Sequence, residues 1–363
     1  MLSESSSLND IPALAPPPHV TSNFTNPPTI MAWIIGVAVT TMVLMLAAIV
    51  IRLFTRLVLL KEWWLEDYLA VLAVIAVVTW EILFVYTASL GMSRHQWDIR
   101  MVDMPRLLEL TNILETLYGP TMFAAKYSVL LQLKRIFCGA RQRDSVWWIL
   151  TILMAAVTIY YWACFISFVF QCWPRAKIQN PLIEGVCIDI SSATLAAGVI
   201  NLVTDVGMLV APLFAIWRLQ MPVKRKLGVA SVFGVGLLAC ITGVFGVVWR
   251  MPLLTSSDLT WILSKTGLWA MAEFCAIILV GCMPSIPMFA KRVVRGSDKN
   301  ASRYNPSGND RYTFSSKRNK IADALTGPGS STAYLTIHDG SSGVKGSEGI
   351  RLEIFDGRRT EGV

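Results

Sequence analysis

Charged residues are scarce in this sequence of 363 residues, at 15% of the chain against about 25% in an ordinary soluble domain. Histidine is rarer still: the three histidines are His19, His95 and His338, and none lies inside an apolar segment. A membrane zinc hydrolase needs histidine and acidic ligands on facing helices, so the sequence excludes that class. It also contains no HExxH, GxSxG or Walker phosphate loop. We therefore expect neither an enzyme nor a metal site.

The last apolar segment has no lysine in its interior. Lys265 lies at its beginning, and the next lysine is Lys291. A retinal-binding rhodopsin forms its Schiff base on a buried lysine inside the seventh helix. We therefore expect no retinal, and no other cofactor.

Long apolar runs are what the chain has in abundance. Hydrophobic residues make up 54% of it, and the mean hydropathy is +0.53. Seven segments approach the roughly 20 residues that a bilayer-spanning helix needs. They run from about Ile30, from Asp67 to Leu90, from about Leu107 to Phe137, from Val146, from about Ala193 to Trp217, from Gly228, and from about Ser264 to Ala290. These runs predict an all-α membrane protein, a bundle of seven transmembrane helices, although polar residues weaken the third segment.

Lys and Arg are distributed unevenly among the segments that connect these runs. The connections after the first, third, fifth and seventh segments contain three times as many of them as the opposite side. The positive-inside rule therefore places the N-terminus outside and the C-terminus in the cytoplasm. The net charge of +8 is then expected to meet anionic lipid, and no nucleic acid partner is expected.

Composition divides the chain into three regions. Residues 1–29 are predicted to be an extracellular disordered tail, 30–290 the seven-helix transmembrane domain, and 291–363 a polar, Gly/Ser-rich and disordered cytoplasmic tail. Asn23 begins the glycosylation acceptor sequence NFT on the predicted outer side, whereas Asn300 begins NAS on the inner side. We expect Asn23 to be glycosylated and Asn300 to remain unmodified.

Two cysteines frame one of the predicted outer connections, in the stretch CWPRAKIQNPLIEGVC. That compartment is oxidising, so a disulfide between Cys172 and Cys187 is expected. In the chain-entropy model, closing a loop of this size stabilises the fold by about 3 kcal/mol. The alternative pairs one of these two residues with Cys164, at the end of the fourth segment.

A carboxylate stands in the middle of the apolar stretch NLVTDVGMLVAPLFAIW, at Asp205. Ionisable residues inside a membrane are costly, so they usually face the bundle interior and pair with one another. Asn201 lies one helical turn earlier, Lys126 is the only lysine well inside a predicted helix, and Glu273 reaches a similar depth. We predict a buried polar network of Lys126, Asn201, Asp205 and Glu273 that holds the helices together. A conformational switch and a direct ligand or ion site remain alternative roles.

Two further glutamates lie toward the predicted outer side. Glu115 is about eight residues into the third segment, and Glu81 lies in the outer part of the second. Glu81 is expected either to line a pocket open to the outside or to point to water.

Five blocks of sequence, taken in order, resemble the fungal rhodopsin-like integral membrane proteins. They are WWLEDYLAVLA, KYSVLLQLKRIF, FQCWP followed by GVCID, the long stretch from NLVTDVG to FGVG, and GCMPSIPMF. This family includes the appressorium surface-sensing receptor and proteins encoded beside secondary-metabolite clusters. The resemblance covers about Met31 to Phe289 and implies a GPCR-like seven-helix fold. It also implies a set of signature positions: Asp67, Lys126, Ser128, Arg135, Cys172, Cys187, Asn201, Asp205, Pro212, Gln220, Lys226, Gly234 and Pro284.

The expected function is that of an orphan receptor-like sensor in the plasma membrane. Its partners are then the lipid bilayer, a small-molecule ligand and a cytoplasmic signalling protein. One alternative is a small-molecule transporter or exporter, although helices one to three and five to seven show no convincing internal repeat. The other is a non-signalling membrane scaffold that recruits a partner through its basic loops and tail.

Overall fold

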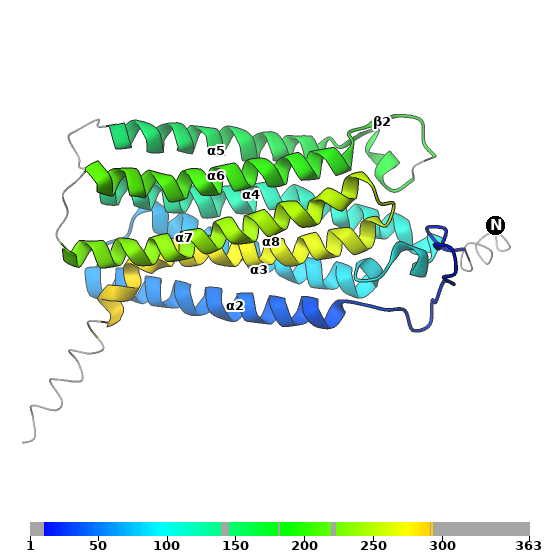
Figure 1. The fold of residues 1–363 in the computed structure, drawn as a ribbon, viewed down its shortest axis with the longest axis horizontal. Coiled ribbons are helices and arrows are strands. Elements are labelled where there is room, and N and C mark those ends of the chain that lie inside the picture. Colours follow the sequence, from blue (N-terminus) through cyan, green and yellow to red (C-terminus); the bar gives the residue numbers. More distant parts are fainter. Residues whose placement is uncertain (1–10, 139–144, 181, 219–222, 291, 293–363) are drawn as a thin grey trace, which may run out of the picture. The chain divides into compact units, whose positions relative to one another are not determined.

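In the computed structural model, the chain forms a bundle of long helices that run along a common direction (Figure 1). The structure describes residues 11–138, 145–180, 182–218, 223–290 and 292, with side chains described outside 215–233. They fall in one compact unit, Met1–Ala301. The second unit, Ser302–Val363, and most of the predicted cytoplasmic tail lie outside the described residues.

Each of the seven predicted segments corresponds to one long helix. The helices are α2 (Met31–Phe54), α3 (Leu65–Thr87), α4 (Met104–Phe137), α5 (Ser145–Val169), α6 (Ile190–Arg218), α7 (Val223–Arg250) and α8 (Leu259–Cys282). Six of them are long and apolar enough to cross a membrane. The exception is α4, whose polar residues lower its hydropathy, although at 34 residues it is the longest. The chain is thus a helical membrane protein.

Local sequence explains where several helices begin and end. Asp189 caps α6, because its carboxylate accepts hydrogen bonds from Ser192 Oγ at 2.5 Å and from the Ser191 amide at 3.1 Å. These bonds, that from Ser192 above all, hold the pKa of Asp189 below its usual range. The last long helix, α8, ends at Cys282 and is followed by a 3₁₀ turn, Met283–Ser285. Pro284 lies in that turn and cannot continue the α-helical hydrogen bonds.

Two helices occupy the centre of the bundle. Helix α4 packs against α3, α5, α6 and α8, and α8 in turn packs against α2, α3 and α7. Within the most apolar window of each helix, 72% of the residues of α8 are buried, against 22% for α5. The peripheral helices therefore leave large apolar side chains exposed, Val39, Ile75 and Ile152 among them, where lipid chains lie in a membrane.

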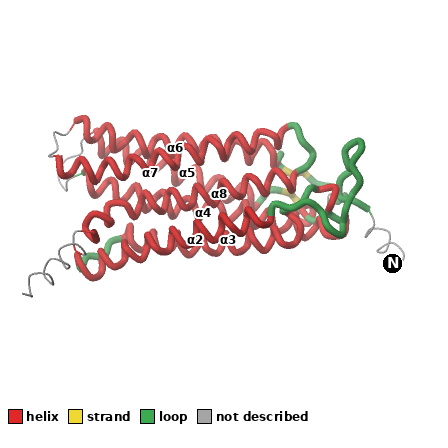
Figure 2. The backbone as a smooth tube through the Cα atoms, turned by 60° about the horizontal axis from the view of Figure 1, so that its bottom comes forward, coloured by secondary structure: helices red, strands yellow, loops and turns green. Residues whose placement is uncertain are grey.

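The two ends of the bundle differ in their connecting segments (Figure 2). At one end, β1 (Cys172–Trp173) pairs with β2 (Val186–Cys187) in antiparallel register, and a disulfide joins Cys172 to Cys187. We call this the disulfide end; at the opposite end α2 and α4 finish and α3 begins. The expected disulfide is thus present, and Cys164 is a free thiol, so the alternative pairing is wrong.

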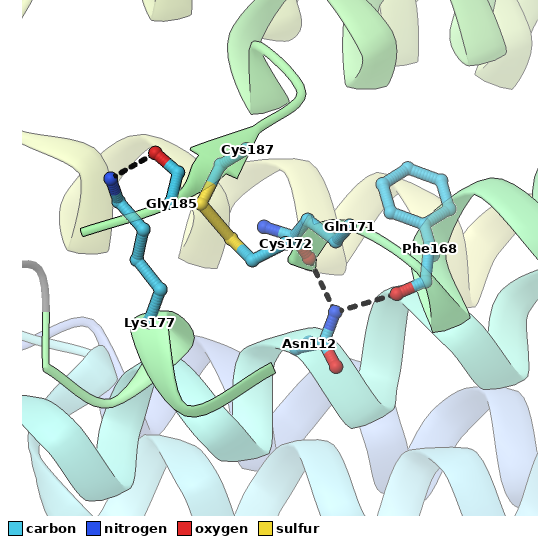
Figure 3. Close-up of a disulfide and its surroundings, with 7 residues drawn as sticks. All are labelled: Asn112, Phe168, Gln171, Cys172, Lys177, Gly185 and Cys187. Atoms are coloured by element: carbon cyan, nitrogen blue, oxygen red, sulfur yellow. Dashed lines mark hydrogen bonds between the residues drawn. A yellow bond between two sulfur atoms is a disulfide. The ribbon is translucent and has the colours of Figure 1, made fainter. Parts of the chain in front are cut away.

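The loop that contains the disulfide is tied to α4 (Figure 3). Asn112 of α4 donates hydrogen bonds to the Phe168 carbonyl, at 3.0 Å, and to the side-chain oxygen of Gln171. Across the loop, Lys177 donates to the Gly185 carbonyl at 2.7 Å. The disulfide end is therefore held by covalent and polar contacts together.

Residues 11–29 are not the disordered tail that composition predicts. The Ala13 amide donates to the Ile99 carbonyl at 2.9 Å, and the Met101 amide donates to the Ile11 carbonyl at 3.0 Å. The Asn23 amide donates to Asp98 Oδ1 at 2.9 Å. The prediction is wrong for this stretch because its backbone groups find partners in the α3–α4 connection, which composition does not reveal. The Asn23 side chain itself remains exposed.

Candidate functional site

Lys126 of α4 lies in the middle of the bundle, with 1% of its side chain exposed. Its ammonium group lies 2.8 Å from Asp205 Oδ1 and donates to Asn201 Oδ1 at 2.7 Å and to Thr204 Oγ1 at 2.8 Å. Tyr161 of α5 donates to the same Asn201 oxygen at 2.6 Å. An ammonium has three protons, and all of them have acceptors here. This middle layer therefore joins α4, α5 and α6, and the structure brings Lys126, Asn201 and Asp205 together as hypothesised; its role stays a prediction.

Glu273 of α8, the fourth residue of the predicted network, belongs to a different layer. Its carboxylate accepts a hydrogen bond from Tyr118 at 3.2 Å, and its Oε1 lies 4.0 Å from Arg250 Nη1. Among the described residues it has no hydrogen bond to Lys126, Asn201 or Asp205. Sequence reasoning estimated its depth in the membrane, but depth does not say toward which neighbour a side chain points.

Arg250 is a site residue that sequence reasoning missed, since it ends α7 and reads as a helix terminus. It is nevertheless only 4% exposed, and two glycines make room for it. A Cβ at Gly198 would lie 2.9 Å from Arg250 Cδ, and a Cβ at Gly246 would lie 2.9 Å from Nη1 and 2.6 Å from Glu273 Oε1. Arg250 Nε and Nη1 and Glu273 Oε1 have no hydrogen-bond partner among the described residues. The layer is thus polar, buried and incompletely paired.

A cavity of about 70 Å³ lies next to this layer, in the half of the bundle nearer the disulfide end. Every long helix except α2 contributes to its lining. Its walls are mostly apolar, with the aromatic rings of Trp80, Phe84, Tyr118 and Phe168, and its polar groups include Glu115 and Arg250. An apolar pocket with a few convergent polar groups is typical of a small-molecule site. A cavity that binds benzene has a volume of about 150 Å³, roughly twice that of this one. A ligand of that size or larger therefore has to push the lining helices apart.

The two remaining glutamates, Glu115 and Glu81, differ in what they contact. Glu115 of α4 is half-buried and lines the cavity, and it accepts one long hydrogen bond, from Thr194 Oγ1 at 3.4 Å. Glu81 of α3 is fully buried and accepts a 2.8 Å hydrogen bond from Thr41 of α2. Of the two expectations for Glu81, the one that it points to water is wrong, because α2 covers it. Glu81 lines a separate cavity between α2 and α3, and whether that cavity opens to the outside stays a prediction.

At the opposite end, Arg52 of α2 is completely buried and binds three other helices. It pairs with Asp67 of α3 at 2.8 Å and donates to Gln132 of α4 at 2.7 Å and to the Gly281 carbonyl of α8 at 2.5 Å. In the sequence, Arg52 comes near the end of the first apolar run and reads as part of the basic connection that follows it. The structure instead places it in the last turns of α2, facing inward.

Glu66, the neighbour of Asp67, extends this cluster toward the surface. Its carboxylate pairs with Arg56 at 3.2 Å and with Arg135 at 2.9 Å, and its carbonyl accepts a hydrogen bond from Ser128 at 2.8 Å. Arg135 also reaches Glu62 at 3.0 Å. These contacts close the opposite end with a continuous set of ion pairs among α2, α3 and α4.

Comparison with known proteins agrees with the blocks of sequence noted above. The family model of the fungal rhodopsin domain matches residues 51–292. A SAT4 family membrane protein of Emericella nidulans is 32% identical over 199 residues, which cover 55% of this chain and 50% of that protein. The fugralins biosynthesis cluster protein 2 of Gibberella zeae is 27% identical over 355 residues, 93% of this chain and 87% of that protein. The chain thus spans half of the first relative and most of the second, and no solved structure matches it.

Proposed function

This chain belongs to the fungal rhodopsin domain family, and we propose that it is a receptor-like membrane protein with a GPCR-like arrangement of helices. Its ligand is a small molecule that enters the cavity at the disulfide end. The observation that carries the proposal is the course of α4. This helix contributes side chains to the cavity with its Glu273–Arg250 layer, to the middle layer of Lys126, and to the ion-pair cluster at the opposite end. Glu115 and Tyr118 lie at the cavity, Lys126 in the middle layer, and Arg135 in the ion-pair cluster.

Two quantities support this coupling: the length of α4 between the two ends and the small volume of the cavity. From Glu115 to Arg135 the helix rises about 30 Å, at roughly 1.5 Å per residue. A ligand that parts the lining helices shifts α4 against α6, and the Lys126–Asp205 contact of 2.8 Å resists that shift. The bundle then has two arrangements, one with the lining helices closed and one with them parted. A ligand that binds the parted arrangement more tightly increases its population, and since α4 reaches both ends of the bundle, both ends change.

We propose further that the disulfide end faces the outside of the plasma membrane and that the opposite end meets a cytoplasmic signalling partner. The distribution of Lys and Arg supports this orientation, and so does the position of the disulfide, which forms in oxidising compartments. Glycosylation of Asn23 in intact cells, with Asn300 unmodified, is the expected result. Glycosylation at Asn300, which lies outside the described residues, would reverse the orientation.

A bulky side chain introduced into the cavity by substitution tests the receptor proposal without knowledge of the ligand. Ala197 of α6 lines the cavity, whereas its neighbour Ala196 is exposed and does not line it. We expect Ala197→Trp to increase hydrogen–deuterium exchange at the opposite end, in residues 61–67 and 132–137, and Ala196→Trp to leave exchange there unchanged. The milder Ala197→Leu covers the case in which the larger variant does not fold. Identical exchange at the opposite end in all three variants would contradict coupling between the two ends.

The main alternative is a transporter. One relative is named for the fugralins biosynthesis cluster, and export of a cluster's product is a role compatible with such a name. A transported molecule has to pass the Lys126 layer, whereas a receptor ligand binds and leaves from the disulfide end. Uptake into vesicles of a compound that binds the cavity separates the two functions, since a receptor does not accumulate it.

A further inference from the structure

Three carboxyl groups lie inside the bundle in the half nearer the disulfide end, and they are not equally satisfied. Glu81 is fully buried; its Oε1 accepts a 2.8 Å hydrogen bond from Thr41, its Oε2 has no partner among the described residues, and it does not line this cavity. Glu273 is 3% exposed, with Tyr118 at 3.2 Å and Arg250 at 4.0 Å. Glu115 is half-buried, lines the cavity, and has a 3.4 Å hydrogen bond, well beyond the usual 2.7–2.8 Å for a hydroxyl donor. It is the carboxyl that a molecule in the cavity can reach.

The charges around the cavity favour a positively charged ligand. The described residues give Glu115 no ion pair within 4.0 Å, and Arg250, which also lines the cavity, has Glu273 as its ion-pair partner. With both carboxyls ionised, one guanidinium is opposed by two negative charges, so one charge is left uncompensated. An unpaired carboxylate inside a membrane is costly, and a ligand that brings a cation removes this cost.

The cavity walls suit a cation with an apolar body. Trp80 and Phe84 are stacked, with ring centroids 5.2 Å apart, and the rings of Tyr118 and Phe168 complete the aromatic lining. Aromatic faces attract organic cations electrostatically and also bury hydrocarbon. Thr194 Oγ1, freed from Glu115, can accept a hydrogen bond from an ammonium proton.

We propose that the ligand class of this cavity is a protonated amine with a compact apolar body, and that its ammonium group pairs with Glu115. The proposal rests on the proposed function, in which this cavity is the ligand site, and adds the chemistry of what binds there. The body lies against Trp80 and Phe84. Arg250 remains paired with Glu273 and does not contact the ammonium group.

Three probes of similar shape test the charge requirement on the purified full-length protein: 2-phenylethylamine, its neutral analogue ethylbenzene, and the anion 3-phenylpropionate. We expect the amine alone to raise the melting temperature at millimolar concentration, since a ligand that binds only the folded state stabilises it. Glu115→Gln keeps the shape of the side chain but removes its charge, and is expected to weaken amine binding at least tenfold. Glu109→Gln is the matched control, because Glu109 lies on the same helix but is exposed; it should bind the amine like the original chain.

The outcomes separate this proposal from the one on which it rests. Equal amine binding by the Glu115→Gln and Glu109→Gln variants, or no stabilisation by the amine, overturns the amine assignment. Stabilisation by ethylbenzene or phenylpropionate that Ala197→Trp abolishes also overturns it, while the cavity stands as a ligand site. If Glu115→Gln does not fold, Glu115→Asp retains the charge at a shorter reach and should bind the amine more weakly than the Glu109→Gln variant. Amine-specific stabilisation that depends on Glu115 supports both proposals.

Discussion

The two ends of this bundle contain similar charged residues but arrange them differently. At the opposite end, Arg52, Arg56 and Arg135 each have a carboxylate partner at 2.8–3.2 Å. Inside the half of the bundle nearer the disulfide end, the ion pair found among the described residues is Arg250 with Glu273, at 4.0 Å. Closely paired charges in a low-dielectric interior hold their helices in one arrangement, because separating them exposes both. Loosely paired charges leave room for another group to complete them.

At the disulfide end the charges of the interior are loosely paired, and the connecting segments hold the helices together instead. The Cys172–Cys187 bond, the Asn112 contacts and the backbone bonds of residues 11–29 all lie there. His95 contacts Asp258 at 2.5 Å and is stacked between Trp97 and Trp261. This end is therefore held together by its connecting segments, whereas the charges in its interior are loosely paired.

The largest effect should come from breaking the cluster at the opposite end. Asp67→Ala leaves the buried Arg52 and also Arg56 without their shared partner, and we expect it to lower the free energy of unfolding by about 3–5 kcal/mol. The control is Glu62→Gln, since Glu62 is 56% exposed and its pair is worth about 0–1 kcal/mol. Chemical unfolding in mixed micelles measures both. Equal losses would mean that burial does not distinguish these pairs.

Removal of the disulfide should have the next largest effect and should act at the other end. Changing Cys172 and Cys187 together to serine reopens a separation of 15 residues, and we expect a loss of about 3 kcal/mol. Cys164→Ser is the control, because Cys164 forms no disulfide. Hydrogen exchange should rise in the residues around the disulfide and stay constant in residues 61–67. A rise confined to the opposite end would contradict the division of the bundle into two separately held ends.

The middle layer between the two ends should show coupling between its members. Lys126→Ala and Asp205→Ala each strand a buried charge, whereas Asp205→Asn keeps the shape and one hydrogen bond and should be milder. A double-mutant cycle of Lys126 and Asp205 should return a coupling of about 0.5–3 kcal/mol. Strict additivity of the two single losses would show that the contact contributes nothing to stability.

The smallest effect on stability should come from the loosely paired carboxyl of Glu115. Glu115→Gln removes a charge that has no close partner among the described residues, while the amide oxygen can still accept the 3.4 Å hydrogen bond from Thr194. We expect the free energy of unfolding to change by less than about 1 kcal/mol, or to increase, because burying a neutral amide costs less than burying an unpaired carboxylate. A loss as large as that of Asp67→Ala in the same unfolding assay would show that Glu115 is firmly paired.

Part of the candidate site was predictable because a few residues left little choice. Lys126 is the only lysine well inside a predicted helix, and Asn201 and Asp205 are four residues apart on one helix face. An acid and a base buried at matching depth have to meet or be neutralised. Arg250 and Arg52 were not predictable in the same way, because each stands near the end of an apolar run and reads equally well as an interfacial residue.

The seven apolar runs were enough to predict seven long helices, because a run of about 20 apolar residues can cross a bilayer; only α4 is too polar to meet that criterion among the described helices. The pairing of Cys172 with Cys187 was likewise predictable, since the two cysteines frame a single connection between apolar runs. Three features could be learned only from the folded chain: Glu273 joins Arg250 and not Lys126, residues 11–29 are held by the α3–α4 connection, and Glu115 lines a cavity. Each of these depends on how a helix is rotated and on which backbone passes beside it. Lipid favours turning the polar side chains of a helix inward, but it does not decide which neighbour they meet, so the rotation is set by the packing of every neighbouring helix at once.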